Sequence, residues 1–395
     1  MRSEPGAPVE AGFVPLCIPE IRGNEWTYVK ECLDTGWVSS VGSYVDRFER
    51  MVADYVGAKY AVATVNGTAA LHIALLVAGV QPEDEVLVSA LTFIASANAI
   101  RYAGAWPVFI DAEPEYWQFD VQKATAFLEQ GCRVQDGALR NSTTGRRVKA
   151  ILAVDILGHP ADRDAIRALA RRFELEVIED ATESLGADYR GKKVGSGSAA
   201  ACFSFNGNKI LTTGGGGMIV TDNEEWMTKA RYLTTQAKDD PLEYIHGEIG
   251  YNYRLTNVQA AIGCAQMEQL NDYVAAKRRI AARYVEAFRD VPGLAPMPEA
   301  AWARNTFWMF TTLVEPPFAL SSRGLLCHLQ THKIQARPLW QPLHLSPAHQ
   351  PAPGLCPVAE SLYARALSLP CSVGLRPEDQ ERVITTILTA GKTNS

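Results

Sequence analysis

Residues 200–221, AACFSFNGNKILTTGGGGMIVT, place one lysine, Lys209, in a polar loop between two short apolar runs. Four consecutive glycines, Gly214–Gly217, follow the lysine. A lysine amine forms a Schiff base only when part of it is neutral, and burial between strands lowers the pKa of a lysine. Glycines let the backbone approach a bulky ligand closely. These residues therefore indicate either a lysine that forms a Schiff base or a strand–turn–strand unit with a solvated lysine.

The upstream segment EVIEDATESLG, residues 176–186, favours the first interpretation. Asp180 ends an apolar run, and Ser204 comes five residues before Lys209. In this pattern the chain resembles the DegT/DnrJ/EryC1/StrS sugar aminotransferases, which are pyridoxal-phosphate (PLP) enzymes of fold type I. The resemblance covers nearly the whole chain. The chain most closely resembles the LegC-like subgroup, in the runs FSFNGNKILTTGGGGMIVT, LTTQAKDDPLEYIH, GYNYRLTNVQAAIG and RPLWQPLHL.

Short apolar runs that alternate with helical patterns predict an α/β fold with a mostly parallel sheet covered on both faces. Helical patterns separate most of the runs, at Thr68–Ala78, Ile94–Tyr102, Val121–Leu128 and Arg163–Arg172. The resemblance implies PLP fold type I, with a large domain at residues 1–265 and a smaller C-terminal α/β domain at residues 266–395. The seven candidate strands are Tyr60–Val65, Glu85–Ser89, Pro107–Asp111, Ala150–Leu157, Val177–Asp180, Ala200–Phe205 and Met218–Thr221.

The remaining patterns complete the expected architecture. Asp136-Gly137, within residues 131–147, predicts a surface hairpin. Further helices are expected at Ile21–Gly36 and Tyr44–Val56, and Arg254–Val274 predicts a long helix that continues through Ala275–Phe288. The C-terminal lobe is expected to contain strands at Asn305–Val314 and Gln335–Leu339 and helices at Leu362–Leu367 and Pro377–Leu388.

Candidate residues follow several of the predicted strands, at or just after the point where each strand ends. In parallel sheets, ligands bind at the carboxyl ends of the strands. The positions of the candidates relative to the strands therefore predict a single site, independently of the family resemblance. The candidates are Gly67 and Thr68 after the first run, Phe93 after the second, Asp180 at the end of the fifth, and Ser204 and Lys209 at or after the end of the sixth.

The resemblance implies catalytic roles for Lys209 and Asp180. Lys209 would hold PLP through its amine and then move a proton between the substrate carbon and the cofactor. Asp180 would pair with the pyridine nitrogen and keep it protonated, which makes the ring a better electron sink. A strand-end aspartate that caps the following helix is the alternative for Asp180.

The resemblance also implies cofactor contacts. Gly67, Thr68 and Ser204 would receive the phosphate, because free N–H groups and the helix dipole at a helix start favour an anion. Phe93 would stack on the pyridine ring. An ordinary capped helix and a core phenylalanine are the alternatives. Glu183 departs from the glutamine usual in the family, and a carboxylate beside the cofactor's phenolic oxygen would repel it unless protonated or turned away.

Six further residues are expected at the partner-subunit and substrate sides of the site. Asn252 matches a residue that reaches the phosphate of the partner subunit's cofactor, which implies a homodimer with shared active sites. A loop asparagine before the helix capped by Thr256 is the alternative. A tryptophan beside an arginine suits a uracil ring and a diphosphate. The residues expected at the substrate side are Trp37, Ser39, Arg337, Trp340 and His344.

Composition sets the broad limits. A net charge of −6 argues against nucleic-acid binding, and no window approaches the roughly 18 apolar residues that span a bilayer. The eight cysteines show no CxxC spacing, so no metal site is expected. Residues 1–12 are expected to be disordered. They lack the apolar core of a signal peptide, which favours a cytoplasmic location.

Together these features predict a PLP-dependent transaminase that uses L-glutamate and a nucleotide-linked 4-keto-6-deoxy sugar. The LegC-like match suggests UDP-2-acetamido-2,6-dideoxy-4-hexulose, for amino sugars of lipopolysaccharide and other surface glycans of the bacillosamine or legionaminate type. A GDP- or dTDP-linked sugar is the alternative. A PLP sugar dehydratase would carry histidine in place of Lys209, and a non-catalytic relative would be expected to lose Lys209 or Asp180.

Overall fold

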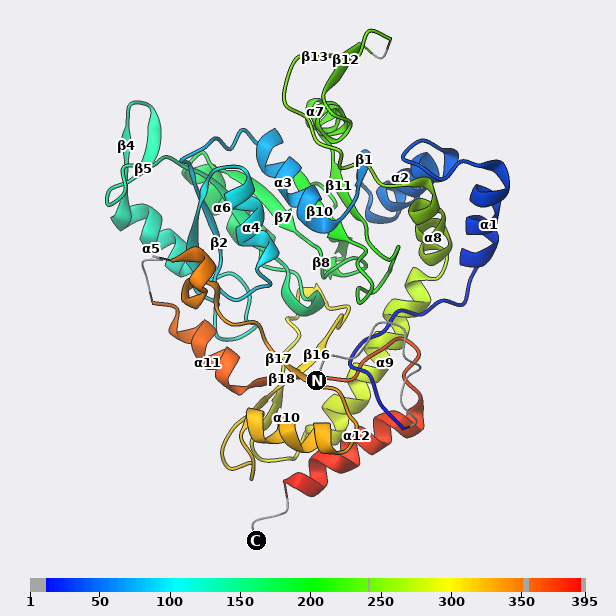
Figure 1. Ribbon diagram of the computed structural model, residues 1–395. Helices are drawn as coiled ribbons and strands as arrows, with labels where there is room; N and C mark the ends of the chain where they lie inside the picture. Colours follow the sequence, from blue (N-terminus) through cyan, green and yellow to red (C-terminus); the bar gives the residue numbers. More distant parts are fainter. Residues whose placement is uncertain (1–11, 241, 351–354, 392–395) are drawn as a thin grey trace.

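A seven-stranded sheet forms the centre of the protein (Figure 1). The computed structural model describes residues 12–240, 242–350 and 355–391, so the expected disorder of residues 1–12 falls almost entirely outside the described residues. The strand order is β1-β11-β10-β7-β6-β2-β3, and only β11 is antiparallel to its neighbours, which confirms the predicted sheet. The strands are β1 (Tyr60–Thr64), β2 (Glu85–Ser89), β3 (Trp106–Ile110), β6 (Val148–Val154), β7 (Glu176–Asp180), β10 (Ala200–Ser204) and β11 (Gly217–Thr221).

The sheet is buried on both faces because successive side chains point to opposite sides of a strand. On β10, Ala200 and Cys202 enter one apolar core, whereas Ala201 and Phe203 enter another. This arrangement explains why the strands read as continuous apolar runs and not as alternating ones.

Helices cover both faces of the sheet. On the first face, one apolar core contains side chains of α3, α4 and α7. On the second face, one core contains side chains of α2 and α8, and another contains side chains of α5 and α6. Their bounds are α1 (Glu25–Thr35), α2 (Ser43–Val56), α3 (Gly67–Val77), α4 (Ala95–Tyr102), α5 (Val121–Gly131), α6 (Arg163–Arg172), α7 (Glu224–Thr234), α8 (Asn257–Met267) and α9 (Leu270–Phe288).

The long helix predicted over residues 254–288 is wrong in one respect, because two helices occupy this range. α8 ends at Met267 and α9 begins at Leu270, with Gln269 between them at φ −108°. The break lets α8 pack against α1 and α2 while α9 turns toward the C-terminal sheet (Figure 1). No proline or glycine marks this position, so the local sequence carried no signal for it.

A second, antiparallel sheet lies in the C-terminal part, with strand order β14-β16-β18-β17. The predicted helix Leu362–Leu367 is wrong at its end: α11 stops at Arg365, and the following residues form β18 because they pair with β16 and β17. The boundary between residues 265 and 266 stays a prediction. The elements are β14 (Leu294–Pro296), β16 (Phe310–Val314), α10 (Ser322–Thr331), β17 (Arg337–Pro338), α11 (Pro357–Arg365), β18 (Ala366–Leu369) and α12 (Pro377–Ala390).

Three small sheets lie outside these two. The predicted hairpin is present as β4 (Cys132–Gln135) and β5 (Ala138–Asn141), and Asp136 and Gly137 in its turn both have positive φ. A second hairpin, β12 (Lys238–Asp240) and β13 (Ile245–His246), projects from the rest of the protein (Figure 1). The third sheet joins β15 (Ala303–Arg304) to β8 (Asp188–Tyr189) and β9 (Lys192–Lys193).

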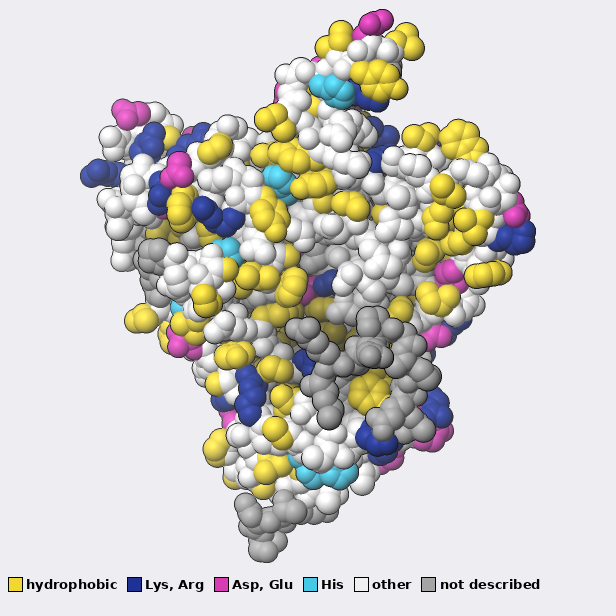
Figure 2. All heavy atoms as spheres, viewed as in Figure 1, with side chains coloured by type: hydrophobic (Ala, Val, Ile, Leu, Met, Phe, Trp, Pro, Cys, Tyr) yellow, Lys and Arg dark blue, Asp and Glu magenta, His cyan; other side chains and the backbone are white. Residues whose placement is uncertain are grey.

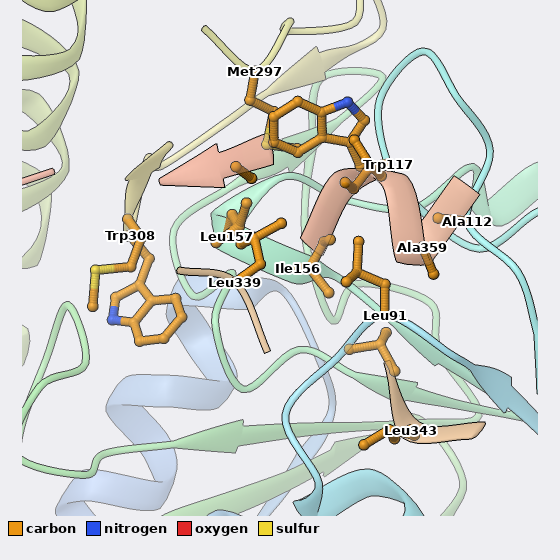
Figure 3. Close-up of a cluster of buried hydrophobic side chains, with 14 of the residues drawn as sticks. Leu91, Ala112, Trp117, Ile156, Leu157, Met297, Trp308, Leu339, Leu343 and Ala359 are labelled. Carbon is orange, nitrogen blue, oxygen red and sulfur yellow. The ribbon is translucent and has the colours of Figure 1, made fainter. Parts of the chain in front are cut away.

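One apolar core joins the large sheet to the C-terminal part. Figure 3 shows Trp308 and Leu339 of the C-terminal part beside Ile156 and Leu157, which follow β6. This packing brings Trp308 close to the carboxyl edge of the large sheet. Within the described ranges, no helix combines the length and the apolar character needed to cross a membrane.

Candidate active site

The candidate residues gather where parallel strands of the large sheet end. Asp180 is the last residue of β7, Ser204 is the last residue of β10, and Lys209 lies in the loop that follows. Gly67 begins α3 just after β1, and Phe93 precedes α4 just after β2. The register of parallel strands therefore places all five at one edge, as expected from the sequence.

The Lys209 amine is held between an aromatic ring and a carboxylate. Its Nζ lies 3.8 Å from the centre of the Trp308 ring and 3.4 Å from Oε1 of Glu183, and its side chain is only 12% exposed. The Trp308 indole N–H donates to the Asn208 carbonyl at 2.7 Å, so the tryptophan also holds the lysine's own loop. The amine is thus fixed at the sheet edge and shielded from solvent.

Asp180 is a buried carboxylate without a cationic partner among the described residues. Its Oδ2 accepts a 2.6 Å hydrogen bond from the Ser96 hydroxyl, and its Oδ1 accepts one from the Thr182 N–H at 3.2 Å. The second bond lies within a turn, because no helix directly follows β7, so it is not the helix cap that we named as the alternative role. The first bond comes from α4 and fixes the direction of the carboxylate from outside its own loop.

Glu183 is buried against Lys209. Its Oε2 accepts the Leu157 N–H at 2.8 Å, and Leu157 provides this N–H from a left-handed conformation with φ 61°. Desolvation raises the pKa of Glu183 to about 7, against the lowering effects of the Lys209 charge and the Leu157 hydrogen bond. The raised pKa favours the protonated carboxyl group, which is one of the two forms expected for a glutamate beside the phenolic oxygen of PLP.

The start of α3 forms an anion seat. Asn66 caps the helix through the Ala69 N–H, and no hydrogen bond occupies the N–H groups of Gly67 or Thr68 within the described part of the chain. A Cβ added at Gly67 would lie 2.7 Å from Cβ of Ser204, so only glycine allows β10 to approach the helix this closely. The seat combines free N–H groups, two hydroxyls and the positive end of the helix dipole.

Phe93 follows β2 at the same sheet edge and has an exposed side chain. Its side chain is 54% exposed, although it follows a fully buried strand. An exposed phenylalanine at the sheet edge offers a face on which an aromatic ligand can stack. The alternative of a core phenylalanine does not fit this exposure.

Asn252, Trp37 and Ser39 form no hydrogen bond or ion pair with Lys209 in the described residues. Asn252 is exposed and lines a hollow of about 750 Å³ whose lining contains none of Lys209, Asp180 or Ser204. Trp37 and Ser39 are exposed in a loop that Asn257 holds through its side-chain and backbone N–H groups. The predicted roles, Asn252 at the partner subunit's cofactor and Trp37 and Ser39 at the substrate side, stay predictions.

The three C-terminal candidates differ in exposure. Arg337 on β17 is exposed, and Trp340 is half-buried against the main apolar core. His344 is buried, and its Nε2 is 3.0 Å from Oε1 of Glu360. This contact occupies Nε2 alone, because Nδ1 is buried without a hydrogen-bond partner among the described residues. The predicted substrate contact of His344, like those of Arg337 and Trp340, stays a prediction.

Comparison with known proteins identifies the family. The model of the DegT/DnrJ/EryC1/StrS aminotransferase family matches residues 19–388. The chain belongs to this family. It is 40% identical to a GDP-perosamine synthase of Caulobacter vibrioides over 95% of this chain and 97% of the relative. It is 39% identical to the GDP-perosamine synthase of Escherichia coli O157:H7, over 93% and 95% of the two chains.

The solved structures agree with this assignment. The crystal structure of the Streptomyces venezuelae enzyme DesV has a TM-score of 0.85 and 31% identity, and the match covers 94% of this chain and 95% of DesV. The protein is therefore a PLP-dependent sugar aminotransferase, and the predicted fold, enzyme class and cofactor are confirmed. The LegC-like subgroup is not supported, because three of the similar relatives are GDP-perosamine synthases.

The described residues fit PLP. Asp180 offers a buried negative charge that lacks a cation, as a protonated ring nitrogen requires. Lys209 offers the amine, Phe93 offers the stacking face, and the start of α3 offers the phosphate seat. Ser96 and Trp308 also belong to the site but were not predicted. A serine at a helix start is too common to indicate an active-site residue. The contact between Trp308 and Lys209 depends on packing between segments that are distant in the sequence.

Proposed function

We propose that this chain transfers the amino group of L-glutamate to the 4-keto carbon of a GDP-linked 4-keto-6-deoxy sugar. The family, the enzyme class and PLP are established above, and the nucleotide and the donor are the new elements. Three relatives named GDP-perosamine synthase, at 40%, 39% and 34% identity over more than nine-tenths of each chain, support GDP. The arrangement that carries the chemistry is the Lys209 amine held beside Glu183, with Asp180 buried on the neighbouring strand.

Lys209 is the proton-transfer group of this proposal. When bound, PLP supplies a ring that accepts the electron pair released at the substrate carbon. The Nζ of Lys209 removes the proton from the α-carbon of glutamate in the first half-reaction and delivers a proton to C4 of the sugar in the second. The Trp308 face keeps the amine at the sheet edge and excludes water from one side of it.

Asp180 and Glu183 set the charges around that amine. Asp180, directed by the Ser96 hydroxyl, holds a proton on the ring nitrogen. Glu183 lies 3.4 Å from the Lys209 amine, and its protonated form would avoid repulsion with the phenolic oxygen of PLP. Because its pKa is raised, Glu183 can replace the glutamine that is expected at this position in most of the family.

A homodimer with shared sites is part of the proposal. Two groups of exposed apolar side chains support it, one on α1 and the loop after it, the other on and beside the β12–β13 hairpin (Figure 2). Apolar side chains gathered in this way mark interaction surfaces. The first group contains Trp26, Leu33, Trp37 and Val41, and the second contains Leu242, Tyr244, Ile245 and Ile249. Asn252 lines the hollow that contains Tyr244 and Val41.

A UDP-linked 2-acetamido sugar is the second candidate. It rests on the resemblance of the NGNKILTTGGGG and RPLWQPLHL runs to enzymes of that kind. The names of the similar relatives favour GDP over UDP.

The experiment is a substrate panel. The enzyme is first converted to its aminated form with L-glutamate, and 4-keto-6-deoxy sugars linked to GDP, UDP or dTDP are then added separately. The proposal expects the GDP-linked sugar to restore the PLP absorbance fastest and to yield an amino sugar by mass spectrometry. Faster recovery with the UDP- or dTDP-linked sugar would overturn the choice of nucleotide, and no recovery with any of them would overturn the substrate class.

A further inference from the structure

A lysine that is not part of the catalytic site lies fully buried between two cysteines. Lys277 on α9 is 1% exposed, and its ammonium donates to the Trp308 carbonyl at 2.9 Å. The other partners of its Nζ are the sulfur atoms of Cys17, at 3.3 Å, and Cys371, at 3.7 Å. In the described residues this ammonium forms no ion pair with a carboxylate. A buried ammonium is costly without a nearby anion, and a thiolate is the anion available here.

The two cysteines are brought together by pairing between segments far apart in the sequence. The Cys371 N–H donates to the Leu16 carbonyl at 2.8 Å, and the Ile18 N–H donates to the Ser372 hydroxyl at 3.1 Å. Cys17 thus lies opposite Cys371, and both sulfurs contact the same nitrogen. Cys17 is partly exposed, whereas Cys371 is buried.

The groups around Cys17 favour its ionised form. The neighbouring Cys371 and the charge of Lys277 lower the pKa of Cys17 to about 5, against the desolvation that raises it. The Lys209 charge acts in the same direction from the loop after β10. The neighbouring Cys17 and burial raise the pKa of Cys371 well above its ordinary value, and its S–H donates to the Trp308 carbonyl at 3.5 Å, so this thiol keeps its proton. The pair therefore combines a nucleophilic thiolate with a protonated thiol.

We propose that Cys17 and Cys371 form a peroxide-sensitive dithiol in which Cys17 reacts first and Cys371 closes a disulfide. The Cys17 thiolate attacks hydrogen peroxide, which forms an S–O bond and breaks the O–O bond. The hydroxide that leaves takes up a proton and becomes water. The Cys371 sulfur then attacks the sulfur of Cys17, which forms the S–S bond and breaks the S–O bond. The thiol proton of Cys371 leaves with the hydroxyl group as a second water.

This pair lies against the catalytic loop. When it holds its proton, the Cys17 thiol donates to the Asn208 carbonyl at 3.4 Å, and Asn208 is the residue before Lys209. The same carbonyl accepts the indole N–H of Trp308, and the Trp308 carbonyl accepts the ammonium of Lys277. The thiol pair and the catalytic amine therefore share one tryptophan as a neighbour.

The first test is the pH dependence of alkylation in the full-length holoenzyme. Cys327, the exposed cysteine on α10, is the internal comparison. At pH 6 a thiol of pKa about 5 is roughly nine-tenths ionised, which outweighs its lower intrinsic nucleophilicity. Limiting iodoacetamide should therefore label Cys17 about fivefold faster than Cys327 at pH 6, and Cys327 should react faster at pH 9. Faster labelling of Cys327 at both pH values would overturn the proposal.

The second test identifies the oxidised product. One equivalent of hydrogen peroxide should lower the mass of the chain by about 2 Da and join the peptides that contain Cys17 and Cys371, by the loss of two hydrogens. Dithiothreitol should reverse the change. Cys17→Ser should abolish the cross-link, and the matched variant Cys327→Ser should retain it. Oxidation that stops at one cysteine, or a bond between Lys277 and a cysteine, would overturn the proposal.

Discussion

The buried Glu183 provides a quantitative test of the site. Desolvation raises its pKa from 4.5 to about 7, so the folded protein keeps a proton that the unfolded chain releases between these values. Stability must therefore fall as the pH rises through this window. One pKa unit corresponds to about 1.4 kcal/mol, so the full loss is about 3 kcal/mol above pH 7. About 2 kcal/mol of this loss falls between pH 5 and pH 7.5.

The matched variant for this test is Glu183→Gln, which keeps the shape of the side chain and removes the titration. Urea unfolding of the cofactor-free protein is measured at pH 5 and pH 7.5 for both proteins at one protein concentration. The wild type should lose about 2 kcal/mol more unfolding free energy than the variant over this interval. An equal loss in the two proteins would show that Glu183 ionises at its ordinary pKa, and the account of the carboxyl group beside Lys209 would be wrong.

Three further substitutions test other parts of the site. Asp180→Asn should retain PLP but lower turnover about a hundredfold, because the ring nitrogen loses the carboxylate that keeps it protonated; an unchanged rate constant removes Asp180 from the mechanism. Ser96→Ala should lower turnover about tenfold, because it removes the 2.6 Å hydrogen bond to Asp180. Ser96→Thr keeps a hydroxyl that can form this bond and should restore turnover. Inactive Lys209→Ala and Asn252→Glu chains should regain activity when refolded together; mixed dimers that stay inactive would place Asn252 at its own chain's site.

Most of the fold could be predicted because local patterns and tertiary structure agree. The seven strands of the large sheet are continuous apolar runs, which is what burial on both faces requires. The β4–β5 hairpin followed from Asp136-Gly137, since both residues adopt positive φ without difficulty. The errors at Gln269 and at Ala366 arose where contacts with other elements decide the conformation and the local pattern is neutral. The predicted strands Asn305–Val314 and Ala150–Leu157 were also too long, because β16 begins at Phe310 and β6 ends at Val154.

The site could be predicted to the extent that it depends on strand ends. Asp180, Ser204 and Lys209 follow from the order of strands in the sheet. Trp308 and Leu157 could not be predicted, because one reaches Lys209 from the C-terminal part and the other offers its N–H from a left-handed conformation with no glycine to signal it. The left-handed region is uncommon for residues with a side chain.

The most direct test of the central claim is the position of the covalently bound cofactor. The holoenzyme is reduced with borohydride, digested with a protease, and the modified lysine is identified by mass spectrometry of the peptides. We expect PLP on Lys209 alone, and the protein Lys209→Ala to show neither the modified peptide nor the cofactor absorbance of the wild type. A stoichiometric label on any other lysine would contradict the account.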